Sequence, residues 1–380
     1  MRLNRLVLRN FRNYVDVEVD FTEQVNFIIG ANAQGKTSLL EAIYFLSTAK
    51  SHRTYPDDEL IRHNQAWFYL KGIVSAAERG SLMTLEASNT LHGRKRFKLN
   101  GNLQPKLSQW IGQFNVVFFS PESLSLVKGV PADRRRFVDL FNSQVNSTYL
   151  THLQNYQFSL RQRNELLKQI QQKLASAGLL ESWDELIVAD GAAIMRGRAE
   201  ALAKLNRLAK AKHADLTGHN EALDLRYQPA VEGVETISES EAKALFRERL
   251  NGSRTQDIAR GTTSFGPHRD DFKLMLEAYS DGGVQYQEAR AFGSQGQQRT
   301  IALALKLSEL ELIRAETLKT PLVLLDDVFS ELDENRSMHL FGLLQGIKAQ
   351  TFITSTRQED WTPEFGDCQV LTVKDGQVLG

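Results

Sequence analysis

The sequence predicts an α/β protein whose mixed sheet is built from both ends of the chain, with a mainly helical lobe inserted between them. Strand-like apolar and alternating runs are concentrated in residues 1–120 and 319–380. Residues 121–213, in contrast, are almost wholly helical in pattern. We therefore expect a discontinuous first lobe, made of residues 1–120 and 319–380, and a second lobe made of residues 121–318.

The N-terminal part is expected to contain strands around one helix. Residues 14–21 alternate polar and apolar side chains, as in a half-exposed strand, and VNFIIG at residues 25–30 is typical of a buried strand. KTSLLEAIYFL, from Lys36 to Leu46, places apolar residues on one helical stripe. Further short strands are expected at residues 67–75, 81–87, 95–104 and 115–119, with a hairpin turn at 99–102.

The middle of the chain predicts two long antiparallel helices, separated by SAG at residues 176–178. At about 1.5 Å per residue, a helix of roughly thirty residues extends about 45 Å. After these helices, strands and one long helix are expected. The strands are LDLRYQPAV, DDFKLML and VQYQEA before the helix, which ends near residue 318, and PLVLLDD, QTFITST and CQVLTV after it.

The composition narrows the class of protein. The 46 Lys and Arg residues balance the 46 Asp and Glu residues, so any contact with nucleic acid must come from local basic patches. Cys368 is the only cysteine, which leaves no disulfide within the chain. The sequence shows neither a signal peptide nor an apolar run of membrane-spanning length. We expect a cytoplasmic protein without a membrane partner.

A phosphate-binding loop is predicted at GANAQGKT, which matches G-x-x-x-x-G-K-[ST] between a buried strand and a helix. Backbone N–H groups of such a loop surround phosphates, and the helix dipole adds to the attraction. Lys36 is expected to reach the β and γ phosphates of ATP, and the Thr37 hydroxyl to bind Mg²⁺. The predicted nucleotide-binding residues are Gly30, Ala31, Asn32, Ala33, Gln34, Gly35, Lys36, Thr37 and Ser38.

An acidic partner for this loop is predicted at VLLDD, residues 323–327. Asp326 follows four apolar residues and is expected to hold Mg²⁺. Asp327 stands where many ATPases place the carboxylate that orients the attacking water, so it is the expected catalytic residue together with Lys36. Alone, such a pair is often only a helix N-cap. Because the loop and the acids lie near opposite ends of the chain, the helical middle must be an insertion.

A second loop, SQGQQ, precedes the long C-terminal helix. The candidate signature residues in this loop are Ser294, Gly296 and Gln297. They lie at a helix N-terminus, which is a potential anion site. In ABC ATPases a short Ser-x-Gly-Gln signature closes over the ATP of another subunit, and this loop is similar to it. The simpler interpretation is a helix cap with Ser294 as the cap residue. SELD at residues 330–333 resembles the loop, here with Asp333, that carries signals between the two ABC sites.

The chain resembles the RecF branch of the SMC-like ABC ATPases over essentially its whole length. The matching segments are LRNFRNY at 8–14, KSHRT at 50–54, PESLSLVKGVPADRRRFVD at 121–139, GPHRDD at 266–271 and LLDDVFSELDENRSMHL at 324–340. The resemblance implies an ABC-type P-loop ATPase head. The sequence differs from transporter-type ABC proteins at two positions, because no His follows QTFITST and no Gln follows NVVFF. Thr354 and Thr356 are therefore alternative sensors of the γ-phosphate.

The resemblance also implies a function. It is that of an ATP-dependent DNA-binding clamp in recombinational repair and replication restart, which dimerises on ATP and helps load recombinase at single-strand gaps. The implied partners are double-stranded and gapped DNA, a second copy of the chain, and the proteins RecR and RecO. The implied activity is a slow, DNA-stimulated ATPase that acts as a switch. Two alternatives remain: an ATP-bound scaffold with negligible turnover, and a transport-energising ABC subunit.

Basic clusters provide candidate contacts to DNA phosphates. GRKRFK and DRRRF are two of these clusters, and further basic residues occur along the two predicted long helices. A solvated helix face explains each residue taken singly. As a set, the candidates are Arg94, Lys95, Arg96, Arg134, Arg135, Arg161 and Arg163. No element has the character of a base-reading helix, so binding is expected to be to backbone and shape.

Overall fold

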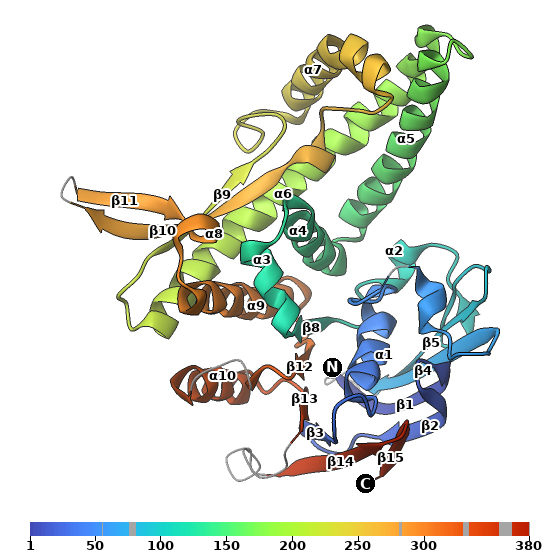
Figure 1. Cartoon of the computed structure of the whole chain (residues 1–380), viewed down its shortest axis with the longest axis vertical. Coiled ribbons are helices and arrows are strands. Elements are labelled where there is room, and N and C mark those ends of the chain that lie inside the picture. Colours follow the sequence, from blue (N-terminus) through green and yellow to red (C-terminus); the bar gives the residue numbers. More distant parts are fainter. Residues whose placement is uncertain (55, 76–80, 281–282, 330–333, 357–366, 380) are drawn as a thin grey trace. The chain divides into compact units, whose positions relative to one another are not determined.

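The chain folds into two compact units (Figure 1). The computed structural model describes residues 1–380 except 55, 76–80, 281–282, 330–333, 357–366 and 380. Unit 1 comprises residues 1–123 and 309–380, and unit 2 comprises residues 124–308. The boundaries predicted from the sequence lie after residues 120 and 318. The second differs more from the observed boundary, because the last part of the long helix that ends at Thr317 belongs to unit 1.

One sheet of unit 1 joins the two ends of the chain, in the strand order β15-β14-β3-β13-β12-β8. All neighbours are parallel except the terminal pair β14–β15. The predicted mixed sheet from both chain ends is thus confirmed. Its strands are β3 (Val25–Ile29), β8 (Val116–Phe119), β12 (Leu322–Asp326), β13 (Thr351–Ser355), β14 (Cys368–Lys374) and β15 (Gln377–Leu379).

The second sheet of unit 1 is antiparallel and comes entirely from the N-terminal part, in the order β2-β1-β4-β5-β6-β7. The expected hairpin turn at 99–102 is confirmed, and it divides residues 95–104 into two strands, with Asn100 and Gly101 at positive φ. The strands are β1 (Arg2–Phe11), β2 (Tyr14–Asp20), β4 (Trp67–Ser75), β5 (Leu82–Thr90), β6 (Arg96–Leu99) and β7 (Asn102–Leu103).

Helix α1 (Lys36–Thr48) contacts strands of both sheets in unit 1, which explains its burial from Ser38 to Thr48. Its side chains are apolar on every side except for a few that are hydrogen-bonded, as expected of a helix enclosed on both faces. Phe45, for example, meets Phe68 of β4 edge to face, with ring centroids 5.5 Å apart. The remaining helices of this unit are α2 (Leu107–Trp110) and α10 (Glu334–Ile347), with the short 3-10 helices η1 (Asp57–Leu60) and η2 (Pro121–Leu124).

Unit 2 is built around the predicted pair of long helices, α5 (Ser147–Gln171) and α6 (Leu180–Thr217) (Figure 1). The 3-10 helix η3 (Ala177–Leu179) interrupts the pair where SAG was expected to break it. A third helix, α7 (Glu239–Arg260), packs on both and was not predicted. Shorter helices are α3 (Ser125–Lys128), α4 (Pro131–Val145), α8 (Ala289–Phe292) and η4 (Pro267–Arg269). None of the helices in the described part of the chain is long and apolar enough to span a membrane.

A three-stranded antiparallel sheet, in the order β11-β10-β9, completes unit 2. Its strands are β9 (Leu223–Gln228), β10 (Asp271–Ser280) and β11 (Gly283–Glu288). Helix α9 (Gln295–Thr317) then leads back to unit 1. Both strands that flank β10 were expected from the sequence, and so was the long helix.

The pair Asp270 and Asp271 anchors separate buried arginines in unit 2. Asp270 accepts hydrogen bonds from Arg198 Nη1 at 2.9 Å, from the Tyr227 hydroxyl at 2.5 Å and from the Ala230 backbone at 2.7 Å. Asp271 accepts two from Arg134. The sequence offered no account of this acidic pair. The structure assigns it to holding α6, α4 and the start of β10 together.

Candidate nucleotide-binding site

The GANAQGKT segment forms a tight loop between β3 and α1, as predicted. Gly35 has φ 120° and Ala33 has φ 64°, which are left-handed conformations that let successive backbone groups turn inward. A Cβ at Gly35 would also lie 2.6 Å from the side chain of Asn13. Lys36 Nζ donates to the carbonyl oxygens of Gly30 at 2.7 Å and Ala31 at 2.9 Å, so the ammonium group lies across the loop.

The loop is held from both ends of the chain. Asn13 Nδ2 donates to the Gln34 carbonyl at 2.8 Å, and the Tyr14 hydroxyl donates to the Gly35 carbonyl at 2.9 Å. From the C-terminal hairpin, the Asp375 backbone donates to Gln34 Oε1 at 2.6 Å. The loop is therefore preorganised by strands β1, β2, β14 and β15, which lowers the entropy lost when a phosphate binds.

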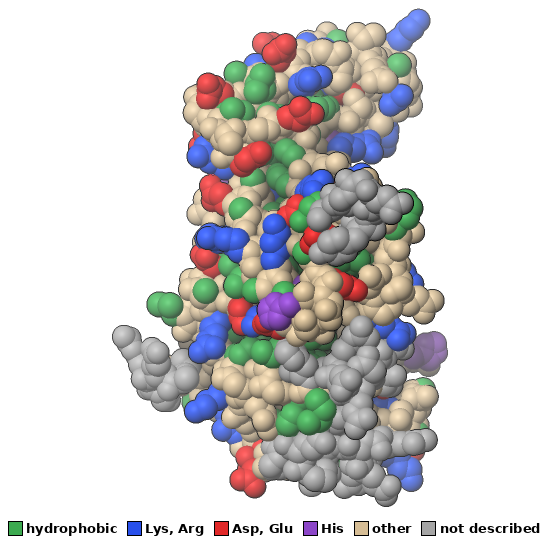
Figure 2. Space-filling model, turned by 90° about the vertical axis from the view of Figure 1, so that its left-hand side faces the viewer, with side chains coloured by type: hydrophobic (Ala, Val, Ile, Leu, Met, Phe, Trp, Pro, Cys, Tyr) green, Lys and Arg blue, Asp and Glu red, His purple; other side chains and the backbone are tan. Residues whose placement is uncertain are grey.

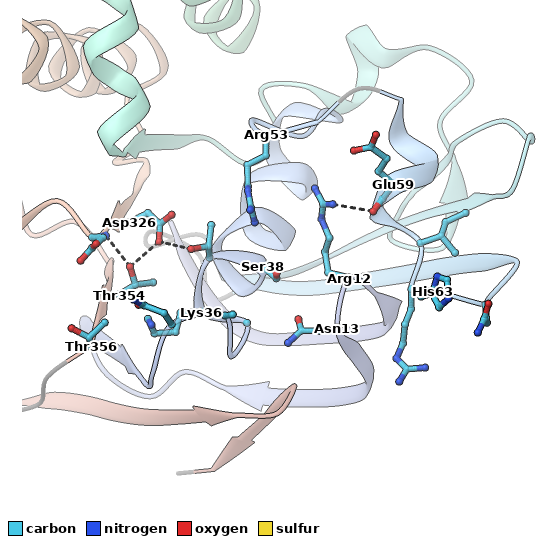
Figure 3. Close-up of a pocket in the computed structure, with 18 residues that line it drawn as sticks. Arg12, Asn13, Lys36, Ser38, Arg53, Glu59, His63, Asp326, Thr354 and Thr356 are labelled. Atoms are coloured by element: carbon cyan, nitrogen blue, oxygen red, sulfur yellow. Dashed lines mark hydrogen bonds between the residues drawn. The ribbon is translucent and has the colours of Figure 1, made fainter.

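Thr37, at the start of α1, forms a connected set with Asp326 and Thr354, which lie at the carboxyl ends of the parallel strands β12 and β13 (Figure 3). The Thr37 hydroxyl donates to Asp326 Oδ1 at 3.0 Å, and the Thr354 hydroxyl donates to the same oxygen at 2.8 Å. Burial raises the pKa of Asp326, against the effect of these two hydrogen bonds. A hydroxyl and a carboxylate oxygen in contact are ligands that suit a hard cation, so the pair fits Mg²⁺.

Asp327 follows this set and faces the same cleft. Its φ is 53°, and its backbone N–H donates to the Thr354 hydroxyl at 2.9 Å. This turn separates the two acids, because Asp326 is buried in the sheet while Asp327 is exposed at the cleft. Of the two alternative γ-phosphate sensors, Thr354 is engaged with both acids, and Thr356 lines the cleft.

A cleft of about 1170 Å³ surrounds these groups. The predicted residues that line it are Asn32, Ala33, Gly35, Lys36, Thr37, Ser38, Asp326 and Asp327. Burial lowers the pKa of Lys36, although Asp327 and Asp326 act in the opposite direction. The structure therefore brings the loop and the acids into one cavity, although 289 positions separate Thr37 from Asp326.

Sequence analysis missed a second group of lining residues at this cleft. They are Arg12, Asn13, Arg53, Glu59, Ile61, Arg62, His63 and Asn64. Figure 3 shows Arg12 and His63 on the side of the cleft away from Asp326, with Arg53 drawn between Arg12 and Asp326. Three residues of this group, Arg12, Asn13 and Arg53, belong to LRNFRNY and KSHRT, which served only as marks of family resemblance. The positions of most of them in loops were the available signal, since binding residues concentrate on loops.

Arg12 is fixed by a buried acid of α1. Its guanidinium donates to both oxygens of Glu41, at 2.8 and 2.7 Å, and to the Glu59 carbonyl at 3.0 Å. Glu41 is fully buried, and burial alone would raise its pKa. Hydrogen bonds from Arg12 and Ser51 outweigh that effect and lower the pKa below its ordinary value. Arg12 is therefore a charged, preorganised group at the edge of the cleft.

The second loop, SQGQQ, lies in unit 2 and starts helix α9. The Ser294 backbone donates to Gln297 Oε1 at 2.7 Å, and the Gln297 backbone donates to Ser294 Oγ at 3.2 Å. This reciprocal pair is a capping box, so the expected cap geometry is present. Ser294 is exposed, and the preceding Phe292 is 71% exposed. An exposed polar loop beside an exposed aromatic side chain is also the pattern of a surface that meets a partner.

The signal loop lies outside the described residues. SELD, including Asp333, occupies residues 330–333, which the structure does not describe. Its assignment stays a prediction from the resemblance.

Two of the predicted DNA contacts are wrong because their side chains are buried. Arg163 is fully buried, and it donates to Asp184 at 2.6 Å and to Asp257 at 2.8 Å. Arg134 is 4% exposed and forms a two-bond ion pair with Asp271. A charge that is already paired inside the protein cannot reach a phosphate at the surface.

Two further DNA candidates are partly engaged, and three are exposed. Lys95 forms an ion pair with Asp57 at 2.6 Å, and Arg135 donates to the Asp270 carbonyl at 2.7 Å. Arg94, Arg96 and Arg161 are exposed and stay candidates. On the face seen in Figure 2, Lys and Arg side chains are interspersed with Asp and Glu.

The chain is similar along its whole length to proteins of one family. Residues 2–374 match the family described as RecF/RecN/SMC N terminal domain. The "DNA replication and repair protein RecF" of Bacillus mycoides is 44% identical over 380 residues, which cover 100% of this chain and 98% of the relative. The chain belongs to the RecF family. The RecF protein of Natranaerobius thermophilus is 42% identical, with the same coverage.

Solved structures agree with this assignment. The structure of "the recombination mediator protein RecF-ATP in RecFOR pathway" is 36% identical, with a TM-score of 0.90, and the match covers 99% of this chain and 96% of the RecF chain. An Smc head bound to the C-winged helix domain of ScpA is 15% identical with a TM-score of 0.55, so it supports the fold alone. The predicted ABC-type ATPase head is thus confirmed, and RecF and Smc heads share it.

Proposed function

We propose that this chain is an ATP-dependent DNA-binding clamp that acts in recombinational repair and replication restart. The observation that carries the proposal is the junction of Thr37 and Asp326 at 3.0 Å in a cleft lined by the phosphate loop. The relatives named "DNA replication and repair protein RecF" and the RecF-ATP structure support the biological role.

ATP binding is assigned to unit 1. The backbone amides of residues 30–37 surround the β and γ phosphates, and the N-terminus of α1 adds a favourable dipole. Lys36 leaves the carbonyl oxygens of Gly30 and Ala31 and places its ammonium between the phosphates. Arg12 and His63, on the other side of the cleft, are proposed to face the nucleoside part of ATP, together with Arg53.

Hydrolysis is assigned to the acids at the end of β12. Thr37 and Asp326 would hold Mg²⁺, which neutralises phosphate charge in such sites. To Asp327, whose backbone is left-handed, we assign the hydrogen bond that orients the attacking water. The carboxylate is one methylene shorter than the glutamate usual in related ATPases, which favours slow turnover. The activity we propose is therefore a slow ATPase, stimulated by DNA, that works as a switch.

The closed state is proposed to be a dimer with two composite sites. In it, Ser294, Gly296 and the amide of Gln297 from one subunit close over the γ-phosphate held by Lys36 of the other. The exposure of Ser294 and Phe292 supports this role, because an internal cap would need neither. The proposed ligand is double-stranded and gapped DNA. Arg94, Arg96 and Arg161 are proposed to contact its phosphate backbone. RecR and RecO are the proposed protein partners, and the pathway named for the RecF-ATP structure supports them.

ATP turnover with and without gapped duplex DNA tests this function. We expect slow phosphate release that rises when DNA is added, and none in Lys36→Arg, because a planar guanidinium cannot replace a compact ammonium between phosphates. Turnover in Lys36→Arg equal to that of the wild type would contradict the assignment of Lys36. ATP binding without any phosphate release would instead favour the alternative of a non-hydrolysing scaffold.

A further inference from the structure

A carboxylate outside the recognised motifs holds the signature loop. Gln297 Nε2 donates to Glu221 Oε1 at 2.9 Å, while Gln297 Oε1 accepts from the Ser294 backbone at 2.7 Å. The glutamine side chain is thus fixed at both ends. The bond to Glu221 therefore sets where the Gln297 side chain lies beside Ser294.

Glu221 lies in the short loop between α6 and β9, so its hydrogen bond to Gln297 connects the end of α6 to the signature loop. Its other oxygen, Oε2, lies 3.6 Å from Nε2 of His213, which is on α6 and fully buried. Within the described part of the chain, neither ring nitrogen of His213 makes a hydrogen bond to a side chain, and neither does Glu221 Oε2. Burial lowers the pKa of His213, while the neighbouring Glu221 acts in the opposite direction.

This arrangement is costly for a structural contact alone. A buried polar atom without a partner lowers stability, and a small shift of Glu221 toward α6 would bring Oε2 within hydrogen-bond distance of His213. The same shift lengthens the bond to Gln297. The Glu221 carboxylate therefore accepts a hydrogen bond from Gln297 in the signature loop, while its other oxygen lies near His213 on α6 at a longer distance.

We propose that Glu221 is a positioning residue of the signature, which orients Gln297 and Ser294 for contact with the γ-phosphate of a partner subunit. The inference rests on the proposed function, because it requires the signature to act between subunits. It adds a residue from the loop after α6 to a site whose motifs all lie elsewhere in the chain. A displacement of α6 would reach the signature through this carboxylate.

The test uses three variants of the full chain, compared with the wild type by light scattering with ATP and by equilibrium ATP binding. Glu221→Ala removes the acceptor. Glu221→Gln keeps a carbonyl acceptor for Gln297 and adds a donor for His213. Glu277→Ala is the matched control, because Glu277 lines the same cavity of about 250 Å³ as Glu221 but makes no hydrogen bond to Gln297.

We expect Glu221→Ala to bind ATP as the wild type does and to need at least tenfold more protein to dimerise. Glu221→Gln should stay within about threefold of the wild type, and Glu277→Ala should match it. Dimerisation of Glu221→Ala at wild-type concentrations would overturn the proposal. So would a defect that Glu221→Gln shares in full, since this would indicate a structural charge. A wild-type protein that ignores ATP would overturn the proposed function itself, and this inference with it.

Discussion

At the scale of single residues, the two acids after β12 have different environments, and this predicts different roles. Asp326 is 8% exposed and accepts hydrogen bonds from Thr37 and Thr354, whereas Asp327 is exposed at the cleft. The sequence showed only two adjacent aspartates. The left-handed turn that separates them could not be foreseen, because aspartate adopts positive φ only occasionally.

Asp327→Asn is expected to bind ATP normally and to hydrolyse it at least tenfold more slowly. The amide keeps the size of the side chain but is a much weaker acceptor for the attacking water. The ATP dimer should consequently live longer. Equilibrium binding and single-turnover hydrolysis on the same preparation check this. If the variant fails to bind ATP, Asp327 is a metal ligand or a structural residue instead.

Asp270→Asn is expected to destabilise unit 2 by about 3–5 kcal/mol, the typical cost of removing one partner of a buried ion pair. Asp270 is 1% exposed, and the substitution leaves Arg198 without one of its two carboxylates. Denaturant unfolding followed by circular dichroism measures the effect. Asp215→Asn, on the exposed side of α6, is the control and should unfold like the wild type. Equal stability of the two variants would refute the anchoring role.

The stability of unit 2 should fall as the pH drops from 6.5 toward 4, in part because of His268. Burial lowers the pKa of His268 to about 4, while its ordinary value is 6.5. In this range the unfolded chain binds a proton that the folded chain does not, so acid favours unfolding. His268→Gln should therefore show a weaker pH dependence of its denaturant midpoint between pH 7 and 5. An unchanged slope would show that His268 titrates normally.

At the scale of elements, the predicted strands and long helices were largely found, because alternation and apolar stripes are local signals. Helix α7 was missed because its apolar face is narrow: Ala242, Phe246 and Leu250 are its buried apolar residues. Its ends did carry signals, a capping box of Ser238 with Glu241 and a left-handed Gly261. The misassigned Arg163 depends on a partner 94 positions away, which no local pattern reveals.

A variant at the start of α9 tests whether the SQGQQ loop is only a helix cap or also a signature that acts between subunits. Ser294→Arg should cost about 1 kcal/mol from the lost cap, bind ATP, and fail to dimerise with ATP, because the bulky cation blocks closure over the partner's nucleotide. Ser238→Ala is the matched control. It removes the same kind of capping box from α7 and should lose similar stability while dimerising normally. Melting temperature and mass with ATP decide the matter, and an ATP dimer of Ser294→Arg would leave the loop a cap only.

At the scale of the whole molecule, the chain distributes its functions between two units. The phosphate loop and both acids belong to unit 1, and the signature loop and Glu221 belong to unit 2. Sequence analysis predicted this division because strand patterns cluster at the chain ends. It could not predict the cleft residues Arg12, Arg53 and His63, since turns carry no periodic signal and their convergence is a product of the tertiary fold.

The most direct test of the central claim is the mass of the wild-type protein in solution, measured by light scattering without nucleotide, with ADP and with ATP. The account predicts a mass near the 43.0 kDa of one chain in the first two conditions and about twice that with ATP. Such a change would show that the γ-phosphate joins two copies of the chain. The same mass in all three conditions would contradict the claim that ATP closes a dimer through the signature loop.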